Sequence, residues 1–356
     1  MNADEAIVVK NAGSHFLLSR LPEWKPFPAV LRGKVRLAGS SSTNPVAVGD
    51  VVRFRMEAGT QFEPNSKEGP VKKGQKRQTP PGFEEGGPSK SAENARAPIA
   101  AGATPAAAII TEVLPRRNYV IRKSTNLSRK NHVIAANLDR AVIAVSLLFP
   151  EIKLPFLDRI LVTCEVYGIK PVIVLNKIDL YGDLYKEEVE NFIRIYEGAG
   201  YLVIQTSCKT GEGIDELREL CSEGVSLFSG ESGVGKSSLI KALDPSLDPK
   251  IGKISAAHLQ GKHTTSLYEM YPLTDGGFII DSPGLRGFGL VDLEKEEIAL
   301  YFPEMLAAAK DCRFTPCTHT HEPGCAVKAA VDRSDISAER YNSYLGMLEE
   351  DTKFRQ

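Results

Sequence analysis

One glycine-rich segment constrains the fold of this chain more than any other. It matches the pattern G-x-x-x-x-G-K-[ST] and comprises Gly230, Glu231, Ser232, Gly233, Val234, Gly235, Lys236 and Ser237. It follows the apolar run GVSLF and opens the helix-prone run SSLIKAL, whose first residues include Ser238. A loop between a strand and a helix can wrap its N–H groups around phosphates, and the helix N-terminus attracts their charge. We expect Lys236 to contact the β- and γ-phosphates and act in catalysis, and the Ser237 hydroxyl to bind Mg²⁺. The alternative is a plain glycine-rich turn, which the flanking strand and helix disfavour.

Apolar runs of strand length alternate with helix-prone segments between Leu138 and Gly230. The strand-like runs are LDRAVIAVSLL, PVIVLNKID, YLVIQTSCK and GVSLFSG, and the helix-prone segments are PFLDRILVTCEVYG, YKEEVENFIRIYEGAG and GIDELRELCSE. Nearly continuous apolar strands indicate a parallel sheet that is covered on both faces. The central part of the chain is therefore predicted to be an α/β P-loop domain.

The residues after two of these runs predict which base the site accepts. An N-K-x-D sequence follows PVIVL and consists of Asn176, Lys177, Ile178 and Asp179. An ionised carboxylate only accepts hydrogen bonds, so Asp179 suits the N1–H and N2–H₂ donors of guanine, a pair that adenine lacks. We expect Lys177 to lie along the base and Asn176 to tie this loop to the glycine-rich loop. The next strand is followed by a sequence typical of the loop whose backbone reads guanine O6, namely Ser207, Cys208 and Lys209.

A third motif follows the run FII and fits the pattern D-x-x-G. Its first residue, Asp281, is expected to hold Mg²⁺ through water, and the amide of its last, Gly284, to sense the γ-phosphate. The preceding segment GKHTTS offers a switch threonine as a further magnesium ligand, either Thr264 or Thr265. Leu285 stands where many GTPases carry a water-orienting glutamine, so His263 is the nearest polar candidate for that role. A simply exposed loop histidine is the alternative.

The order of these motifs along the chain is unusual. A typical GTPase runs from the phosphate loop through the switch threonine and D-x-x-G to the two base-reading loops, whereas here both base-reading loops precede Gly230. In an open α/β sheet all of these loops lie at the carboxyl ends of strands. Joining the original termini and opening the chain after D-x-x-G therefore leaves the site intact. The order predicts a circularly permuted GTPase domain that uses GTP with Mg²⁺.

Three cysteines and a histidine crowd into one short stretch near the C-terminus, at Cys312, Cys317, His319 and Cys325. Three thiolates and an imidazole form a closed tetrahedral zinc site of the structural kind. His321 is a competing ligand, and unrelated free cysteines are the alternative interpretation. The cluster predicts one structural Zn²⁺ per chain in a small helical domain, since a helix-prone tail follows it.

The N-terminal part predicts a small all-β barrel, because short strand-like segments (AIVVKNAGSHFLL, AVLRGKVRLAG, VAVGDVVRFRM) alternate with turn residues. Between about residues 59 and 108 large apolar residues are nearly missing, which predicts a disordered insertion in the barrel. We expect no membrane span and no signal peptide, and the cysteine distribution suits a reducing cytoplasm. The net charge is −1, so nucleic-acid contact would need local basic patches. The stretch 122–130 is one candidate, although such a run is more often a solvated face.

Taken together, the permuted motifs, the barrel and the C-x4-C-x-H-x5-C pattern resemble the RsgA (YjeQ/YloQ) family of bacterial ribosome small-subunit-dependent GTPases. The matching sequences are GESGVGKSS, NKID, GKHTT, DSPGLRGF, CRFTPCTHTHEPGCAV and IAANLD. The resemblance covers the chain except the insertion, which is longer than expected, and Cys208 replaces a more usual alanine. It implies an OB-fold barrel, a permuted GTPase domain and a C-terminal zinc domain. It also implies late maturation of the 30S subunit, binding to 16S rRNA, a role of His263 in hydrolysis and zinc ligation by His319.

We therefore expect three domains, at residues 1–115, 116–300 and 301–356, in a cytoplasmic monomer. The predicted function is that of a GTP hydrolase whose turnover is stimulated by the 30S subunit and coupled to release. Its expected partners are the 30S subunit, 16S rRNA and GTP/GDP, without a membrane. The alternative is a nucleotide-gated RNA-binding module in which GTP acts as a clamp and is not turned over. A GTP-dependent metabolic enzyme is disfavoured, because no residues remain for a small substrate.

Overall fold

The computed structural model describes residues 2–13, 15–31, 46–56, 108–122, 132–247, 268–281 and 293–350. Several predictions fall outside these residues and stay predictions. They concern the switch residues His263, Thr264 and Thr265, the end of the D-x-x-G motif with Gly284 and Leu285, the insertion up to residue 107, and most of the basic stretch. Ala108, expected to end the insertion, is buried and opens a strand instead.

The central sheet has the parallel strands that the sequence predicts. Its elements are β8 (Arg140–Val145), α1 (Leu154–Val166), β9 (Lys170–Asn176), η1 (Ile178–Leu180), η2 (Asp183–Tyr185), α2 (Lys186–Gly198), β10 (Leu202–Thr206), α3 (Ile214–Cys221), β11 (Val225–Gly230), α4 (Lys236–Leu243), β12 (Tyr268–Pro272) and β13 (Phe278–Asp281). The strand order is β10-β9-β8-β11-β13-β12, and only β12 runs antiparallel to its neighbour. The late strand β11 lies between β8 and β13, as the permuted motif order requires.

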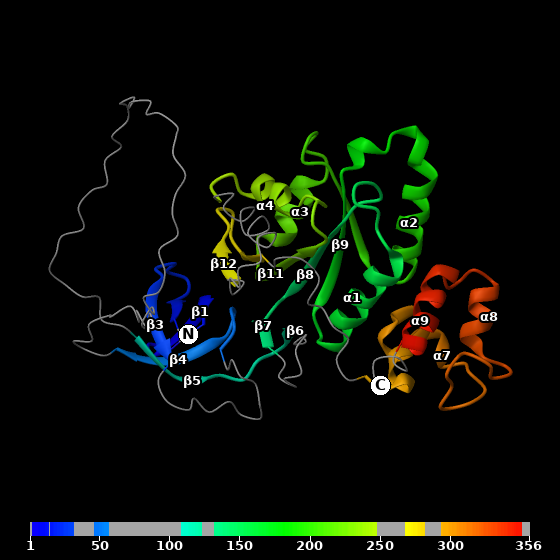
Figure 1. The fold of residues 1–356 in the computed structure, drawn as a ribbon, viewed down its shortest axis with the longest axis horizontal. Coiled ribbons are helices and arrows are strands. Elements are labelled where there is room, and N and C mark those ends of the chain that lie inside the picture. Colours follow the sequence, from blue (N-terminus) through cyan, green and yellow to red (C-terminus); the bar gives the residue numbers. More distant parts are fainter. Residues whose placement is uncertain are drawn as a thin grey trace, which may run out of the picture.

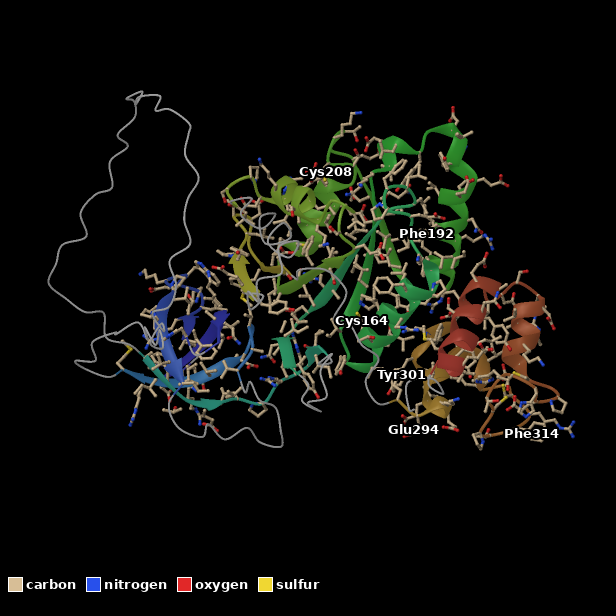
Figure 2. All side chains as sticks on the ribbon, viewed as in Figure 1. Cys164, Phe192, Cys208, Glu294, Tyr301 and Phe314 are labelled. Carbon is tan, nitrogen blue, oxygen red and sulfur yellow. The ribbon has the colours of Figure 1, made fainter. Side chains whose placement is uncertain are left out.

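Alternate residues of the strands enter two separate cores, because successive side chains of a strand point to opposite faces. In β8, Ile143 packs with α1 and α2, whereas Val142 packs with α3 and α4. Apolar side chains cover both faces of β8, which explains why its run reads as continuous hydrophobic sequence rather than as alternation. Cys164 belongs to the α1 core, and Figure 2 shows it far from Cys208, which lies near the opposite end of the sheet.

Five strands form the N-terminal barrel, here called the barrel: β1 (Glu5–Ala12), β2 (His15–Ser19), β3 (Phe27–Leu31), β4 (Val51–Met56) and β5 (Ala108–Val113). They pair in the order β1-β2-β3-β5-β4, and a β1–β4 pairing closes the ring, so the predicted barrel is confirmed. The segment AIVVKNAGSHFLL, expected as one strand-like unit, is a hairpin of β1 and β2, because Gly13 adopts a positive φ between them.

The barrel and the central sheet form one continuous sheet. The first half of β1 pairs with β4, and its second half pairs on the same edge with β12. The hairpin of β6 (Tyr119–Arg122) and β7 (His132–Ala136) connects the two parts along the chain. Figure 1 shows the barrel on one side of the central sheet and the C-terminal helices on the other.

Residues 293–350 form the C-terminal unit, which contains α6 (Lys295–Ile298), η4 (Ala299–Tyr301), α7 (Pro303–Ala309), α8 (Ala326–Asp332) and α9 (Ala338–Glu350). Its core includes Phe302, Met305 and Tyr344, and Val162 of α1 packs into it. The expected domain limit at residue 300 falls inside η4, and the domain limits stay predictions. Among the described residues, no helix has the length and apolar character needed to cross a membrane.

Candidate functional site

The sheet register brings three of the predicted motif positions to one edge. Asn176 ends β9 beside Thr206 of β10, Gly230 ends β11, and Asp281 ends β13 beside Phe228 of β11. These strands are parallel, so their carboxyl ends share an edge, where α/β sheets bind their ligands. The base-reading and phosphate-binding motifs therefore meet although they are reversed in sequence.

The glycine-rich loop leads from β11 into α4, which starts at Lys236. The Lys236 ammonium donates to the main-chain oxygens of Gly230 (2.6 Å) and Glu231 (2.8 Å). Burial lowers the pKa of Lys236, and the nearby Asp281 and Glu231 carboxylates oppose that shift. Phosphate oxygens of a bound nucleotide could accept hydrogen bonds from the same ammonium group, so Lys236 is placed to contact them. Ser237 and Ser238 are exposed on the first turn of α4.

Asp281 is the described member of the D-x-x-G motif. Burial raises the pKa of its carboxyl to about 6, although the Lys236 charge favours the ionised form. A partly buried carboxylate whose counter-charge among the described residues is Lys236 suits a site that also receives a divalent cation. With the Ser237 hydroxyl at the start of α4, these oxygen donors fit Mg²⁺, a hard cation that prefers oxygen ligands.

Asn176 joins the two halves of the site, as predicted. Its Nδ2 group donates to the main-chain oxygen of Val234 in the glycine-rich loop (2.8 Å), and its Oδ1 accepts from the Thr206 hydroxyl (3.0 Å). Gly235 has a φ of +99°, and a Cβ there would lie 2.4 Å from Asn176 Nδ2. Only glycine at this position therefore permits the contact between the loops.

The other base-reading residues lie beside Asn176. Lys177 has a left-handed φ of 66°, and its ammonium donates to the main-chain oxygens of Phe149 and Gly233, the latter at 2.6 Å. Asp179 accepts from the Ser207 hydroxyl at 2.7 Å, so the N-K-x-D and S-C-K loops are joined by their side chains. Ile178 opens η1 after Lys177.

Two residues of the S-C-K loop are exposed at the edge of this network. Cys208 is exposed, and its Sγ lies 4.0 Å from Asn176 Oδ1. The Lys209 ammonium lies 3.9 Å from an oxygen of Asp179, and its side chain is 80% exposed.

The predicted metal ligands come together in the C-terminal unit. The Sγ atoms of Cys312 and Cys325 are 3.9 Å apart, and His319 Nδ1 lies 3.6 Å and 3.4 Å from them. Including Cys317, all four donor atoms lie within 4.8 Å of one another. His321 is exposed, with its Nδ1 2.9 Å from the Thr320 hydroxyl, and it is not part of this group.

These spacings can be compared with a tetrahedral zinc site. Typical Zn–S and Zn–N bond lengths place two thiolates about 3.8 Å apart and a thiolate about 3.6 Å from an imidazole nitrogen. The distances among Cys312, His319 and Cys325 are close to these values, and Cys317 lies within reach, so the cluster can hold a metal ion. The backbone around it is fixed as well, since the Tyr341 hydroxyl of α9 donates to the main-chain oxygen of His319 (2.6 Å).

Sequence patterns missed two groups of residues near these sites. Tyr181 and the loop after β8, residues 146–150, contact the base-reading loops, although they belong to no motif. Arg340 of α9 is buried with Asp158 of α1, which no local pattern indicated. For Tyr181 and residues 146–150, one sequence feature could have given an indication: an aromatic residue stands two positions after Asp179.

Comparison with known proteins supports the same assignment. The family model described as RsgA GTPase matches residues 113–291. Proteins named small ribosomal subunit biogenesis GTPase RsgA are similar over nearly the full length. The protein from Bacteroides fragilis is 39% identical over 99% of both chains. That from Flavobacterium psychrophilum is 39% identical over 97% of this chain and 92% of its own.

Two solved structures resemble this fold. YjeQ from Thermotoga maritima has a TM-score of 0.69 and 27% identity, and 98% of each chain is covered. YloQ, described as a circularly permuted GTPase, has a TM-score of 0.63 over 99% of this chain and 96% of its own, and at 23% identity it supports the fold alone. Together with the sheet order and the strand-end motifs, these similarities confirm the circular permutation. The chain belongs to the RsgA family of GTPases.

Proposed function

We propose that this protein is a GTPase that acts in the late maturation of the 30S ribosomal subunit. The observation that carries the proposal is the hydrogen bond from Asn176 to Val234, which holds a guanine-specific loop against a phosphate-binding loop. The ribosomal role is supported by relatives that are named for biogenesis of the small ribosomal subunit and match over nearly their whole length.

Each loop has a distinct role in this proposal. Asp179 accepts the two guanine N–H donors, and the S-C-K backbone binds O6. Gly230 to Ser238 cradle the phosphates, and Lys236 supplies positive charge as charge develops on the β/γ oxygens. Mg²⁺, held by Ser237, Asp281 and one of Thr264 and Thr265, would neutralise phosphate charge. We assign γ-phosphate sensing to Gly284 and water orientation to His263.

The metal cluster is proposed to hold one structural Zn²⁺. Cys312, Cys317, His319 and Cys325 form a closed set, so the ion would stabilise the C-terminal unit rather than bind substrate. Metal analysis of protein purified without chelators should find about one zinc per chain. Retention of zinc after Cys325→Ser would contradict the assignment.

The proposed partners are the 30S subunit and its 16S rRNA, bound by a cytoplasmic monomer. Contact with the subunit should stimulate hydrolysis, which would then promote release. The family membership favours this enzyme over a clamp that never turns GTP over. Measurement of GTP turnover with and without 30S subunits distinguishes the two hypotheses.

Asp179→Asn tests the nucleotide assignment directly. The change replaces an acceptor by an amide that can donate to the 2-oxo group of xanthine, so affinity should move from GTP to XTP. The exposed Asp183, four residues further on, provides a control: Asp183→Asn should leave GTP affinity unchanged. Unchanged GTP binding by Asp179→Asn, with no gain for XTP, would refute the proposed base site.

A further inference from the structure

A tyrosine outside the recognised motifs connects the loops of the nucleotide site. Tyr181 follows Asp179 by two residues, and only 3% of it is exposed. Its hydroxyl donates to the main-chain oxygen of Asn176 (2.7 Å) and accepts from the main-chain N–H of Leu147 (2.9 Å). One phenol thus connects the end of β9 with the loop that follows β8.

Lys177 makes a second contact with the loop after β8. The Lys177 ammonium donates to the main-chain oxygen of Phe149 and, at 2.6 Å, to that of Gly233 in the phosphate loop. Phe149 has a left-handed φ of 52°, a conformation that costs a phenylalanine energy and that surrounding contacts must maintain. Tyr181 and Lys177 thus hold residues 147–149 between the base-reading loop and the phosphate loop.

Three polar groups of Asn176 are therefore held by hydrogen bonds. Tyr181 fixes its main-chain oxygen, Thr206 donates to its Oδ1, and its Nδ2 donates to Val234. The last two contacts hold only the side chain. The Tyr181 contact holds the backbone from which Lys177 and Asp179 project.

We propose that the Tyr181 hydroxyl is a positioning element for guanine-nucleotide binding, which sets the base-reading backbone against the phosphate loop through Asn176 and residues 147–149. This inference rests on the proposed function of the site. Tyr181 itself need not touch the nucleotide. Burial raises the pKa of its hydroxyl, so the group stays protonated and able to donate at neutral pH.

The test is Tyr181→Phe in the full chain, with fluorescent GDP as the probe. The ring is retained, while two main-chain groups lose their partner, so the dissociation rate of GDP should rise about tenfold. The single-turnover rate of GTP hydrolysis at saturating protein should change less than twofold, because the phosphate contacts of Lys236 remain. The variant should therefore bind GDP less tightly while hydrolysing bound GTP at nearly the wild-type rate.

Tyr196→Phe is the matched control. Tyr196 is also buried and lies in α2, and its hydroxyl is beside Asp158 of α1 rather than beside a nucleotide loop. Its GDP dissociation rate should equal that of the wild type. Thermal unfolding of both variants without nucleotide identifies a general loss of stability.

Three outcomes overturn the inference. An unchanged dissociation rate in Tyr181→Phe would mean that only ring packing matters. A fall in the single-turnover rate as large as the loss of affinity would indicate general damage to the site. Equal effects of Tyr181→Phe and Tyr196→Phe would indicate a purely structural role. If Asp179→Asn switches the base to xanthine while Tyr181→Phe has no effect, the proposed function stands and only this inference falls.

Discussion

The barrel and the C-terminal unit are attached to the central sheet in different ways. The barrel joins by main-chain pairing, with Lys10 opposite Glu269 and Asn11 opposite Tyr268. The C-terminal unit shares no strand with the sheet and packs its helices on α1 instead. Main-chain pairing depends little on side-chain identity, whereas a helical interface depends on particular side chains.

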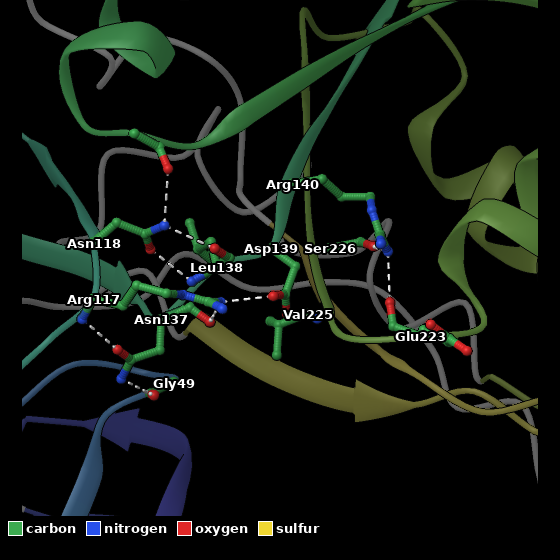
Figure 3. A network of polar contacts seen from close by, with 11 residues as sticks. Gly49, Arg117, Asn118, Asn137, Leu138, Asp139, Arg140, Glu223, Val225 and Ser226 are labelled. Carbon is green, nitrogen blue, oxygen red and sulfur yellow. Dashed lines mark hydrogen bonds and ion pairs between the residues drawn. The ribbon is translucent and has the colours of Figure 1, made fainter.

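Polar contacts reinforce the barrel junction. Asn137 Nδ2 donates to the main-chain oxygen of Gly49 (2.9 Å), and Figure 3 shows this contact beside those of Asn118 and Arg117. A Cβ on Gly49 would lie 2.1 Å from the main-chain oxygen of Ala136, so the barrel backbone approaches β7 as closely as glycine allows. Many of these groups are partly exposed, so each contact contributes modestly.

One buried charge dominates the other junction. The Arg340 guanidinium of α9 donates to Asp158 of α1 (2.7 Å) and to Glu304 of α7 (2.8 Å). The rings of Phe302 and Tyr201 lie 4.6 Å and 5.3 Å from its central carbon. Such a cluster permits little adjustment, because losing any partner leaves a charge buried without compensation.

The two attachments also reach the nucleotide site through different elements. The C-terminal unit contacts α1, which lies between β8 and β9 in the base-reading half. The barrel pairs with β12, and β12 pairs with β13, which ends at Asp281 in the phosphate half. GTP and GDP differ only at the γ-phosphate, so they can affect the two halves differently. We expect nucleotide state to shift the barrel relative to the C-terminal unit.

The largest effect should follow from breaking the buried cluster. Arg340→Ala leaves Asp158 and Glu304 without their partner, so the free energy of unfolding should fall by about 3–5 kcal/mol. Denaturant unfolding measures this change. The control is Arg333→Ala, because Arg333 pairs with Asp335 at 2.9 Å and both side chains are mostly exposed. Similar losses in the two variants would contradict the importance of the buried cluster.

A smaller effect is expected at Asp281, and it depends on pH. Its pKa is about 6 in the folded chain and has an ordinary value of 3.8. Between these values the folded state binds more protons than the unfolded state, so the stability of the nucleotide-free protein falls as pH rises from about 4 to about 6. Asp281→Asn should therefore stabilise the nucleotide-free protein at pH 7 by roughly 1–3 kcal/mol, while weakening Mg²⁺-dependent hydrolysis. Unfolding curves at several pH values test this, and lower stability of the variant at pH 7 would contradict it.

The smallest effect should come from the ion pair at the barrel junction. Lys10 and Glu269 are 2.7 Å apart, with side chains 30% and 28% exposed. Lys10→Ala leaves the main-chain pairing in place, so the free energy of unfolding should change by only about 0–1 kcal/mol. Denaturant unfolding again gives the value. A loss as large as that of Arg340→Ala would show that the barrel also depends on a specific side chain.

The sequence predicted what local spacing encodes. The strand ends at Asn176, Gly230 and Asp281 follow from apolar runs and motifs, and so does the meeting of their loops at one edge. The metal cluster was equally local, because its ligands span few residues. The antiparallel strand β12 was missed, since apolar and polar residues do not alternate clearly in Tyr268–Pro272.

Contacts between distant segments could not be predicted in this way. Arg340 and Asp158 are 182 positions apart, and Lys10 and Glu269 are 259 apart. Each of these residues reads alone as an ordinary surface charge. Only the fold brings them together, so no pattern within a single element could identify the junctions. Tyr181 escaped prediction for a related reason, because its partner Leu147 belongs to another strand's loop.

Nucleotide state is expected to move the barrel relative to the C-terminal unit, which stays with the base-reading half. The direct test is a distance measurement between site-specific labels at exposed positions: Glu23 after β2, Glu190 on α2 and Asp335 in the C-terminal unit. The Glu23–Asp335 distance should differ between GDP and a non-hydrolysable GTP analogue, while the Glu190–Asp335 distance should stay constant. A constant Glu23–Asp335 distance, or a changing Glu190–Asp335 distance, would contradict this expectation.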